Sequence, residues 1–257
     1  HRKTEQLIDT LDKVEQNRKE CYIREFSIEH FHDSKVFETL IPKICKIFRE
    51  ENEELTGFEN EEILAEYQIY KTPGYVYMKG NVQIYSAGKQ AADISAFPEG
   101  IAVAVGSEED VPDICPDQTI DKVFTIENLT SFYRFKQEHS LVIYLGGYHN
   151  HSRRNLLMQI YQKLPDAQYY HFGDLDAGGF YILEHLKRKT GIPFQMFQMD
   201  IETLKKYEDY AKPLTENDKK RLMQLEKMEL PDEERKLITY MLQKGIKLEQ
   251  ECISESQ

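Results

Sequence analysis

From residue 122 onward, the chain alternates between two hydrophobic periods. Apolar runs of strand length are separated by segments in which apolar residues recur every three or four positions. The expected strands are 123–128, 141–147, 167–172 and 194–200. The expected helices are 129–137, 152–164 and one opened by Gly178-Gly179, with further helices from 203, 215 and 232. Repeated strand–helix units of this kind predict an α/β fold with a Rossmann-like, mostly parallel sheet covered on both faces.

The first 118 residues show a different order, with helical segments first and short strands after them. Helical spacing is found over 1–20, 36–47 and 60–67, and Pro42 is expected to interrupt or kink the second helix. Two apolar stretches, 75–78 and 82–85, flank Lys79-Gly80-Asn81 and predict a hairpin.

Helices followed by a hairpin are compatible with a winged helix or with another small α+β module. The acidic segment 107–118, which contains two prolines, is typical of a linker. We therefore expect a smaller α+β module over 1–118 and an α/β domain with C-terminal helices over 119–257.

Composition narrows the class of protein. The sequence has no apolar run near the ~20 residues of a membrane helix, and its four cysteines form no C-x-x-C pair, so we expect a cytoplasmic protein without a membrane span. The formal net charge of −12 opposes unaided binding to nucleic acid. Eight of the acidic residues lie within 50–66, a segment without Lys or Arg, so the excess of negative charge in the rest of the chain is smaller.

Acidic residues follow two of the predicted parallel strands. Glu127 ends the first strand of the α/β region, and Asp174 and Asp176 follow the third. Because parallel strands deliver their carboxyl ends to one edge of a sheet, these three carboxylates can converge there and bind a divalent cation. Taken singly, each has an alternative interpretation, since a glutamate at a strand end is often solvated or caps the next helix, and Asp-x-Asp before glycine is common turn chemistry.

The segments FTIENLTSF and FGDLDAGGFYIL resemble the Toprim domain of topoisomerases, primases and overcoming-lysogenization-defect nucleases. Together with REFSIEHFHDSK, PGYVYMKGNVQI and GIKLEQE, they resemble more narrowly the C-terminal part of the JetD family, the nuclease subunits of Wadjet plasmid-defence systems. In the related topoisomerase VI A subunits, Pro usually follows the Asp-x-Asp. Ala177 stands there in this chain, which removes a helix-start preference but no ligand.

The resemblance implies a metal-dependent endonuclease that cleaves double-stranded DNA with Mg²⁺ or Mn²⁺. Glu127 is carried over as a ligand that could also act as general base, and Asp174 and Asp176 as ligands. Glu249 and Glu251 could complete a second metal site or be solvated. Gly178 and Gly179 could admit a phosphate at a helix N-terminus or be sterically permissive. Arg153 and Arg154 could track a DNA backbone.

The family also implies partners, namely a condensin-like loop-extruding complex and a second copy of the chain in a homodimer. Three other functions stay open. One is a catalytically inactive Toprim shell in such a complex, and another is a glycosyltransferase, in which Asp-x-Asp would hold a metal–sugar-nucleotide. The third is a topoisomerase VI-like transesterase, which needs a tyrosine nucleophile from the N-terminal module. The candidates for that nucleophile are Tyr67, Tyr70, Tyr75, Tyr77 and Tyr85.

Overall fold

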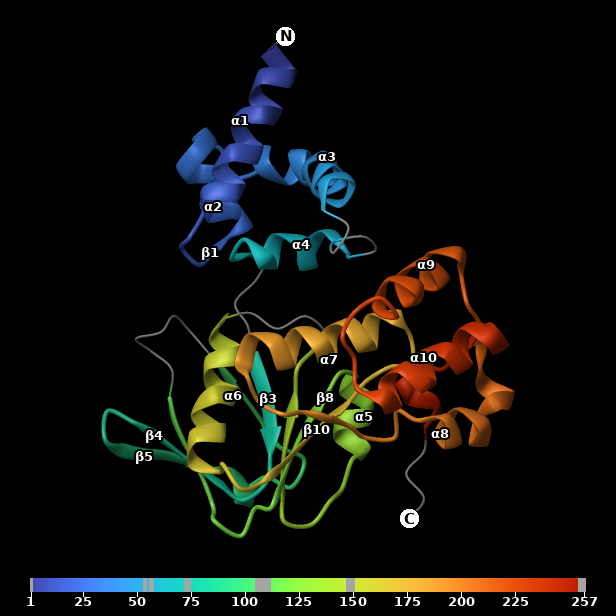
Figure 1. Cartoon of the computed structure of the whole chain (residues 1–257). Helices are drawn as coiled ribbons and strands as arrows, with labels where there is room; N and C mark the ends of the chain where they lie inside the picture. The colour runs from blue at the N-terminus through green and yellow to red at the C-terminus, as the bar shows by residue number, and fades with distance from the viewer. Residues whose placement is uncertain are drawn as a thin grey trace. The chain divides into compact units, whose positions relative to one another are not determined.

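The computed structural model describes residues 2–52, 55, 58–71, 75–104, 112–146 and 151–253. The chain divides into two compact units, His1–Gly74 and Tyr75–Gln257. Figure 1 shows the elements of both units along the chain. No helix within the described ranges is long and apolar enough to cross a membrane.

The first unit is built mainly from helices. Its elements are α1 (Arg2–Gln16), β1 (Cys21–Tyr22), α2 (Ile23–Phe31), α3 (Val36–Glu51), α4 (Asn60–Glu66) and β2 (Ile69–Tyr70). Helices α2 and α3 pack through Phe26 and Phe37, whose ring centroids are 4.5 Å apart, and Ser27 Oγ accepts a hydrogen bond from Phe37 N at 3.0 Å. An interruption at Pro42 is wrong, because α3 continues through this residue, and a kink there stays a prediction.

The second unit holds the remaining strands and helices. The elements of its first half are β3 (Tyr75–Lys79), β4 (Val82–Ser86), β5 (Lys89–Asp93), β6 (Ile101–Ala104), β7 (Asp113–Pro116), β8 (Lys122–Ile126), α5 (Leu129–Arg134) and β9 (Ser140–Tyr144). Those of its second half are α6 (His151–Lys163), β10 (Gln168–Phe172), α7 (Ala177–Thr190), β11 (Gln195–Met196), α8 (Ile201–Lys206), β12 (Lys212–Pro213), α9 (Glu216–Leu225), α10 (Asp232–Lys244) and β13 (Ile246–Lys247).

The α/β class is confirmed, and the main sheet has six strands in the order β11-β10-β8-β9-β3-β6. The four strands from β8 to β11 are parallel, whereas β3 and β6 add an antiparallel extension. The chain leaves β8 for its neighbour β9 and then returns to β10 on the other side of β8. Strands β8 and β10 therefore flank a topological switch point, the place where open α/β sheets bind ligands beyond the strand carboxyl ends.

The predicted hairpin is wrong, because β3 and β4 belong to different sheets. Strand β3 pairs with β9 and β6, while β4 pairs with β5 and β7. Gly80 makes this separation possible. It has a φ of 138°, and a Cβ on it would lie 2.6 Å from the Ser140 carbonyl oxygen, so only glycine fits this crossing between sheets. With β3 and β6 in the main sheet, the boundary between compact units falls at residues 74 and 75, not at the expected 118 and 119.

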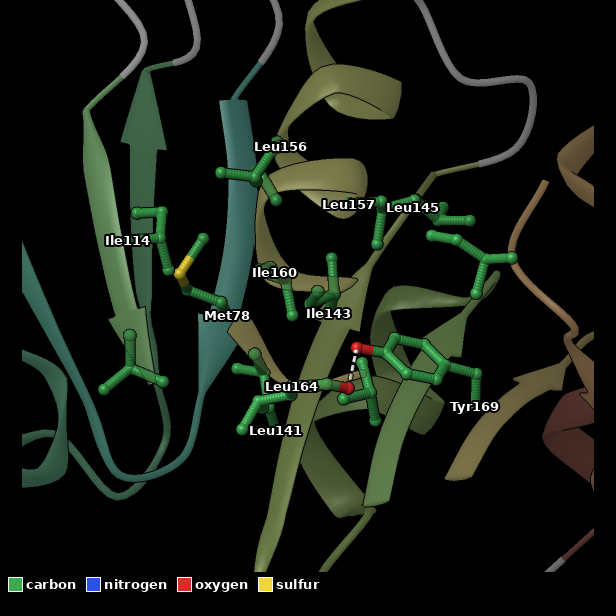
Figure 2. Packing of buried hydrophobic residues seen from close by; sticks show 14 of the residues in the cluster. Met78, Ile114, Leu141, Ile143, Leu145, Leu156, Leu157, Ile160, Leu164 and Tyr169 are labelled. Carbon is green, nitrogen blue, oxygen red and sulfur yellow. Dashed lines mark hydrogen bonds between the residues drawn. The ribbon is translucent and has the colours of Figure 1, made fainter. Parts of the chain in front are cut away.

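An apolar layer lies between the main sheet and α6 (Figure 2). Leu156, Leu157 and Ile160 of α6 are buried in one cluster with Ile143 of β9. Tyr169 of β10 joins this layer and donates its hydroxyl hydrogen to the Leu164 carbonyl oxygen at 3.0 Å. Residues of β10 with odd numbers thus face α6 and α7, and the same alternation continues toward the carboxyl end of the strand.

Helix α10 contributes a buried carboxyl group that interacts with α7. Glu234 is 4% exposed, and its Oε1 lies 2.8 Å from Lys187 Nζ, which is also paired with Glu184. Burial raises the pKa of Glu234 to about 7, and Glu184 also raises it, whereas Lys187 lowers it. Two carboxyl groups therefore share one ammonium group in a largely dry environment.

We expect Glu234→Gln to stabilise the protein at pH values above about 7 and to change little below about 4.5, the ordinary value. A raised pKa means that the folded state favours the protonated carboxyl, so its stabilising effect is lost as pH rises through the folded-state value. The expected gain at high pH is on the order of 1 kcal/mol. Urea unfolding at both extremes measures it, with the exposed neighbour Glu233→Gln as control. Equal curves for Glu234→Gln and wild type at high pH would contradict this expectation.

Candidate metal centre

Glu127 is held at the carboxyl edge of the sheet by the pairing of β8 with β10. Ile126 and Phe172 are register partners, and Glu127 N donates to the Phe172 carbonyl oxygen at 3.1 Å. The next residue, Asn128, caps α5, since its side chain accepts a hydrogen bond from Ser131 N at 3.1 Å. The helix therefore turns away at once and leaves the glutamate at the sheet edge.

Asp174 lies beside Glu127 although 47 residues separate them in sequence. Its backbone N–H donates to Glu127 Oε2 at 3.4 Å, and its own Oδ1 accepts from Gln250 N at 2.7 Å. Burial raises the pKa of Asp174 to about 6; the Gln250 hydrogen bond lowers it, and the charges of Asp176 and the C-terminal glutamates raise it further. Asp174 is therefore a buried carboxyl among like charges.

Asp176 is the N-cap of α7. Its Oδ1 accepts a hydrogen bond from Gly179 N at 2.9 Å. In the structure, Asp176 therefore acts as a helix cap. Its role as a metal ligand stays a prediction. The two roles are compatible in principle, because a carboxylate has a second oxygen and further lone pairs.

The C-terminal segment reaches the same edge through an isolated antiparallel bridge, in which Leu175 and Leu248 exchange two backbone hydrogen bonds of 2.9 and 3.1 Å. Glu251 Oε1 accepts from Asn128 Nδ2 at 2.5 Å, and Glu249 Oε1 pairs with Lys212 Nζ at 2.5 Å. Both glutamates thus lie near Asp174, whose pKa they raise. Each also has a hydrogen-bonded partner of its own.

Gln250 is a residue of this site that the sequence interpretation missed. It is 0% exposed, its Oε1 accepts from Asn128 N at 2.9 Å, and its Nε2 donates to the Phe172 carbonyl oxygen at 3.0 Å. With its backbone bond to Asp174, one residue ties together the ends of β8 and β10 and a candidate ligand. The sequence offered no more than its place between Glu249 and Glu251, because the burial that makes polar partners necessary is seen only in the structure.

We expect Gln250→Ala to lower the free energy of unfolding by about 1–3 kcal/mol, because it leaves the Asn128 N–H and the Phe172 carbonyl without their partner. Denaturant unfolding measures this change. The matched control is Gln243→Ala on α10, where the side chain is exposed and a change within about 0.5 kcal/mol is expected. Equal effects of the two substitutions would show that Gln250 does not hold the strand ends together.

The two glycines after Asp176 have different surroundings. A Cβ on Gly179 would lie 2.1 Å from the Asp174 carbonyl oxygen, whereas one on Gly178 would meet only the Asp176 side chain, at 3.2 Å. Gly179 is therefore required for close packing of the α7 N-terminus on the Asp174 backbone. Phosphate binding by either glycine stays a prediction.

The candidate DNA contacts and tyrosines also have defined positions. The Arg153 guanidinium donates to the Leu145 and Tyr75 carbonyl oxygens at 2.6 and 3.3 Å, which ties α6 to the strand ends. Arg154 is half-buried on the same helix. Tyr67 and Tyr70 lie in the first unit, but Tyr75, Tyr77 and Tyr85 are in the second. These three therefore do not come from a separate N-terminal module, as the transesterase interpretation requires.

The donor set can be tested against a divalent cation. Among the described residues, no group of three or more His, Cys, Asp or Glu side chains already surrounds a position where a metal ion could be held. The acids nevertheless raise the pKa of Asp174, and a cation that prefers oxygen ligands, such as Mg²⁺ or Mn²⁺, would relieve this repulsion. The chemistry of the donors fits such an ion, while the side chains that would hold it are engaged in hydrogen bonds within the chain.

Fold and site together define an α/β protein with an acidic edge at the switch point of its parallel strands. A family model described as Wadjet protein JetD, C-terminal, matches residues 109–257, so the chain belongs to this family. The curated Wadjet protein JetD of Bacillus cereus (strain Q1) is 29% identical over 254 residues, which cover 97% of this chain and 61% of that protein. The chain thus spans about three fifths of the length of this curated relative.

Proposed function

We propose that this chain carries the catalytic centre of a Mg²⁺- or Mn²⁺-dependent endodeoxyribonuclease that cleaves double-stranded plasmid DNA in a Wadjet defence system. The observation that carries the proposal is the contact between Glu127 and Asp174 at the ends of two adjacent parallel strands. Membership of the JetD family supports it, and the matched residues include all five candidate acids.

Each side chain has a defined task in this proposal. Glu127, Asp174 and Asp176 hold the divalent cation, and Glu249 and Glu251 complete a second position. A cation at this edge would supply activation of water and neutralisation of charge on the phosphodiester. The protein's own contribution is orientation, since Gln250 fixes Asp174 and the end of β8. The first turn of α7 offers backbone N–H groups suited to a phosphate oxygen.

The net charge of −12 explains why a partner would be needed. Affinity for a DNA backbone depends on neutralising phosphates, so this chain alone is expected to bind DNA weakly and with a steep dependence on salt. A loop-extruding complex of the condensin type would supply the DNA. A homodimer would place two such centres on the two strands, because a twofold axis relates both the subunits and the strands of a duplex.

The test is cleavage of supercoiled plasmid with Mn²⁺ by the protein, alone and together with the other Wadjet subunits. We expect Glu127→Ala to abolish cleavage and Glu202→Ala, an exposed acid on α8, to leave it unchanged. Full cleavage by Glu127→Ala would refute the proposed centre. Loss of cleavage in both variants would point to a general loss of folding or assembly, which circular dichroism of each variant detects.

A further inference from the structure

His171 is a buried polar residue of β10 that the proposed chemistry does not yet use. It is 0% exposed and is the register partner of Thr125 on β8. Its Nδ1 lies 2.9 Å from Thr125 Oγ1, whereas its Nε2 is buried with no hydrogen-bond partner among the described residues. An unpartnered buried nitrogen destabilises the folded state, so its retention in the core needs an explanation.

The surroundings of Gly173 show where the free nitrogen points. A Cβ on Gly173 would lie 2.8 Å from His171 Nε2 and 2.7 Å from Glu127 Oε2. The nitrogen and the carboxylate oxygen therefore approach the same space, which a side chain at residue 173 would otherwise fill. Thr125 and His171 are register partners and face the same side of the sheet. Glu127 and Gly173 directly follow β8 and β10 and continue this alternation, so the four positions form one column that ends at the acidic edge.

The chemistry of this column favours one hydrogen-bond direction. Burial lowers the pKa of His171 to about 3, so the imidazole is neutral and carries one proton. The Thr125 hydroxyl has one proton and two acceptors within reach, His171 Nδ1 at 2.9 Å and the Tyr170 carbonyl oxygen at 3.3 Å. Donation over the shorter distance, to Nδ1, leaves the proton of the imidazole on Nε2. An ionised Glu127 carboxylate can only accept, so an Nε2–H is the complementary partner for it.

We propose that His171 is a positioning residue, whose Nε2–H donates to the Glu127 carboxylate and fixes the direction in which Glu127 presents its other oxygen to the cation. Thr125 sets the tautomer of the imidazole. The inference rests on the proposed function, because it concerns the orientation of a candidate ligand. Hydrogen-bond donors behind metal-binding carboxylates act in this way, and their removal typically weakens metal affinity by about 10–100-fold.

The first measurement is Mn²⁺ affinity by isothermal titration calorimetry, without DNA or turnover. We expect His171→Leu to bind Mn²⁺ about 10–100-fold more weakly than wild type and His171→Gln, which keeps an amide N–H donor, to recover most of this loss. Without metal, the melting temperature of His171→Leu should lie within a few degrees of the wild-type value. The control is His185→Leu, a buried histidine of α7, which should keep wild-type affinity. Wild-type affinity in His171→Leu would overturn the proposal.

The second measurement does not depend on metal and so separates this proposal from the proposed function. Long-range ¹H–¹⁵N correlation spectra of the eight histidines, with His171 assigned by its loss in His171→Gln, report the tautomer in the apo protein. We expect the proton on Nε2 and a shift of its resonance in Glu127→Gln. A proton on Nδ1, or no response to Glu127→Gln, would refute the positioning role. An Nε2–H coupled to Glu127 in a protein that binds no Mn²⁺ would instead refute only the metal site.

Discussion

Asp174→Asn is expected to abolish Mn²⁺-dependent plasmid cleavage and to leave the apo protein as stable as wild type or more stable. Burial and the neighbouring acids raise the pKa of Asp174 to about 6, so at pH 7 the carboxyl is largely ionised and its ionisation costs more free energy in the folded than in the unfolded state. Asparagine keeps an oxygen that can accept from Gln250 N but carries no charge. The gain in stability should be on the order of 1 kcal/mol at pH 7 and should vanish below about pH 4, where the wild-type carboxyl is also neutral.

Thermal melts with and without Mn²⁺, combined with the cleavage assay, measure both halves of this prediction. Mn²⁺ should raise the melting temperature of wild type but not of Asp174→Asn, because a ligand that binds only the folded state stabilises it. The matched control pair is Asp176→Asn and Asp200→Asn. Both aspartates cap a helix through the same type of bond, and asparagine caps as well as aspartate.

Only Asp176→Asn should lose cleavage and the Mn²⁺-induced rise. If Asp174→Asn were less stable than wild type without metal, and Mn²⁺ still raised its melting temperature as much as that of wild type, the acids would serve the fold and not a cation. If Asp176→Asn kept cleavage and the Mn²⁺-induced rise as Asp200→Asn does, Asp176 would be a helix cap and not a metal ligand.

The parallel part of the sheet could be predicted from sequence because its signals are local. Each strand from β8 to β10 is a short apolar run followed by a helical pattern, and such units pair in parallel with their carboxyl ends at one edge. That rule alone brought Glu127 next to Asp174, which the hydrogen bond between them now shows. The identity of the metal and the number of ions do not follow from the same rule, since they depend on side-chain geometry.

The antiparallel extension could not be predicted in this way. Strands β3 and β4 are separated by two residues and have the composition of a hairpin, yet Met78 pairs with Ile143 of β9. This pairing depends on contacts between segments more than 60 residues apart, for which the local pattern holds no information. The same limit applies to Gln250, whose partners are the distant ends of β8 and β10.

Gly179→Ala is expected to destabilise the protein severely, whereas Gly178→Ala should have almost no effect. The added methyl at residue 179 would lie 2.1 Å from the Asp174 carbonyl oxygen, a backbone atom that can move only if the turn between β10 and α7 moves. Overpacking of this kind typically costs about 1–3 kcal/mol, and the shift would also displace Asp174 from Gln250. At residue 178 the methyl would meet only the Asp176 carboxylate, at 3.2 Å, and alanine favours the helix by about 0.5–1 kcal/mol over glycine.

This pair of substitutions separates packing from phosphate binding as the reason for the two glycines. If they served only to admit a phosphate, both alanine variants would weaken DNA binding, measured by fluorescence anisotropy, and neither would change the melting temperature. If Gly179 serves packing, Gly179→Ala alone should melt at a lower temperature and lose Mn²⁺ affinity, since the Asp174 backbone is part of the site. Identical melting temperatures for the two variants would contradict the close approach of α7 to the Asp174 carbonyl oxygen.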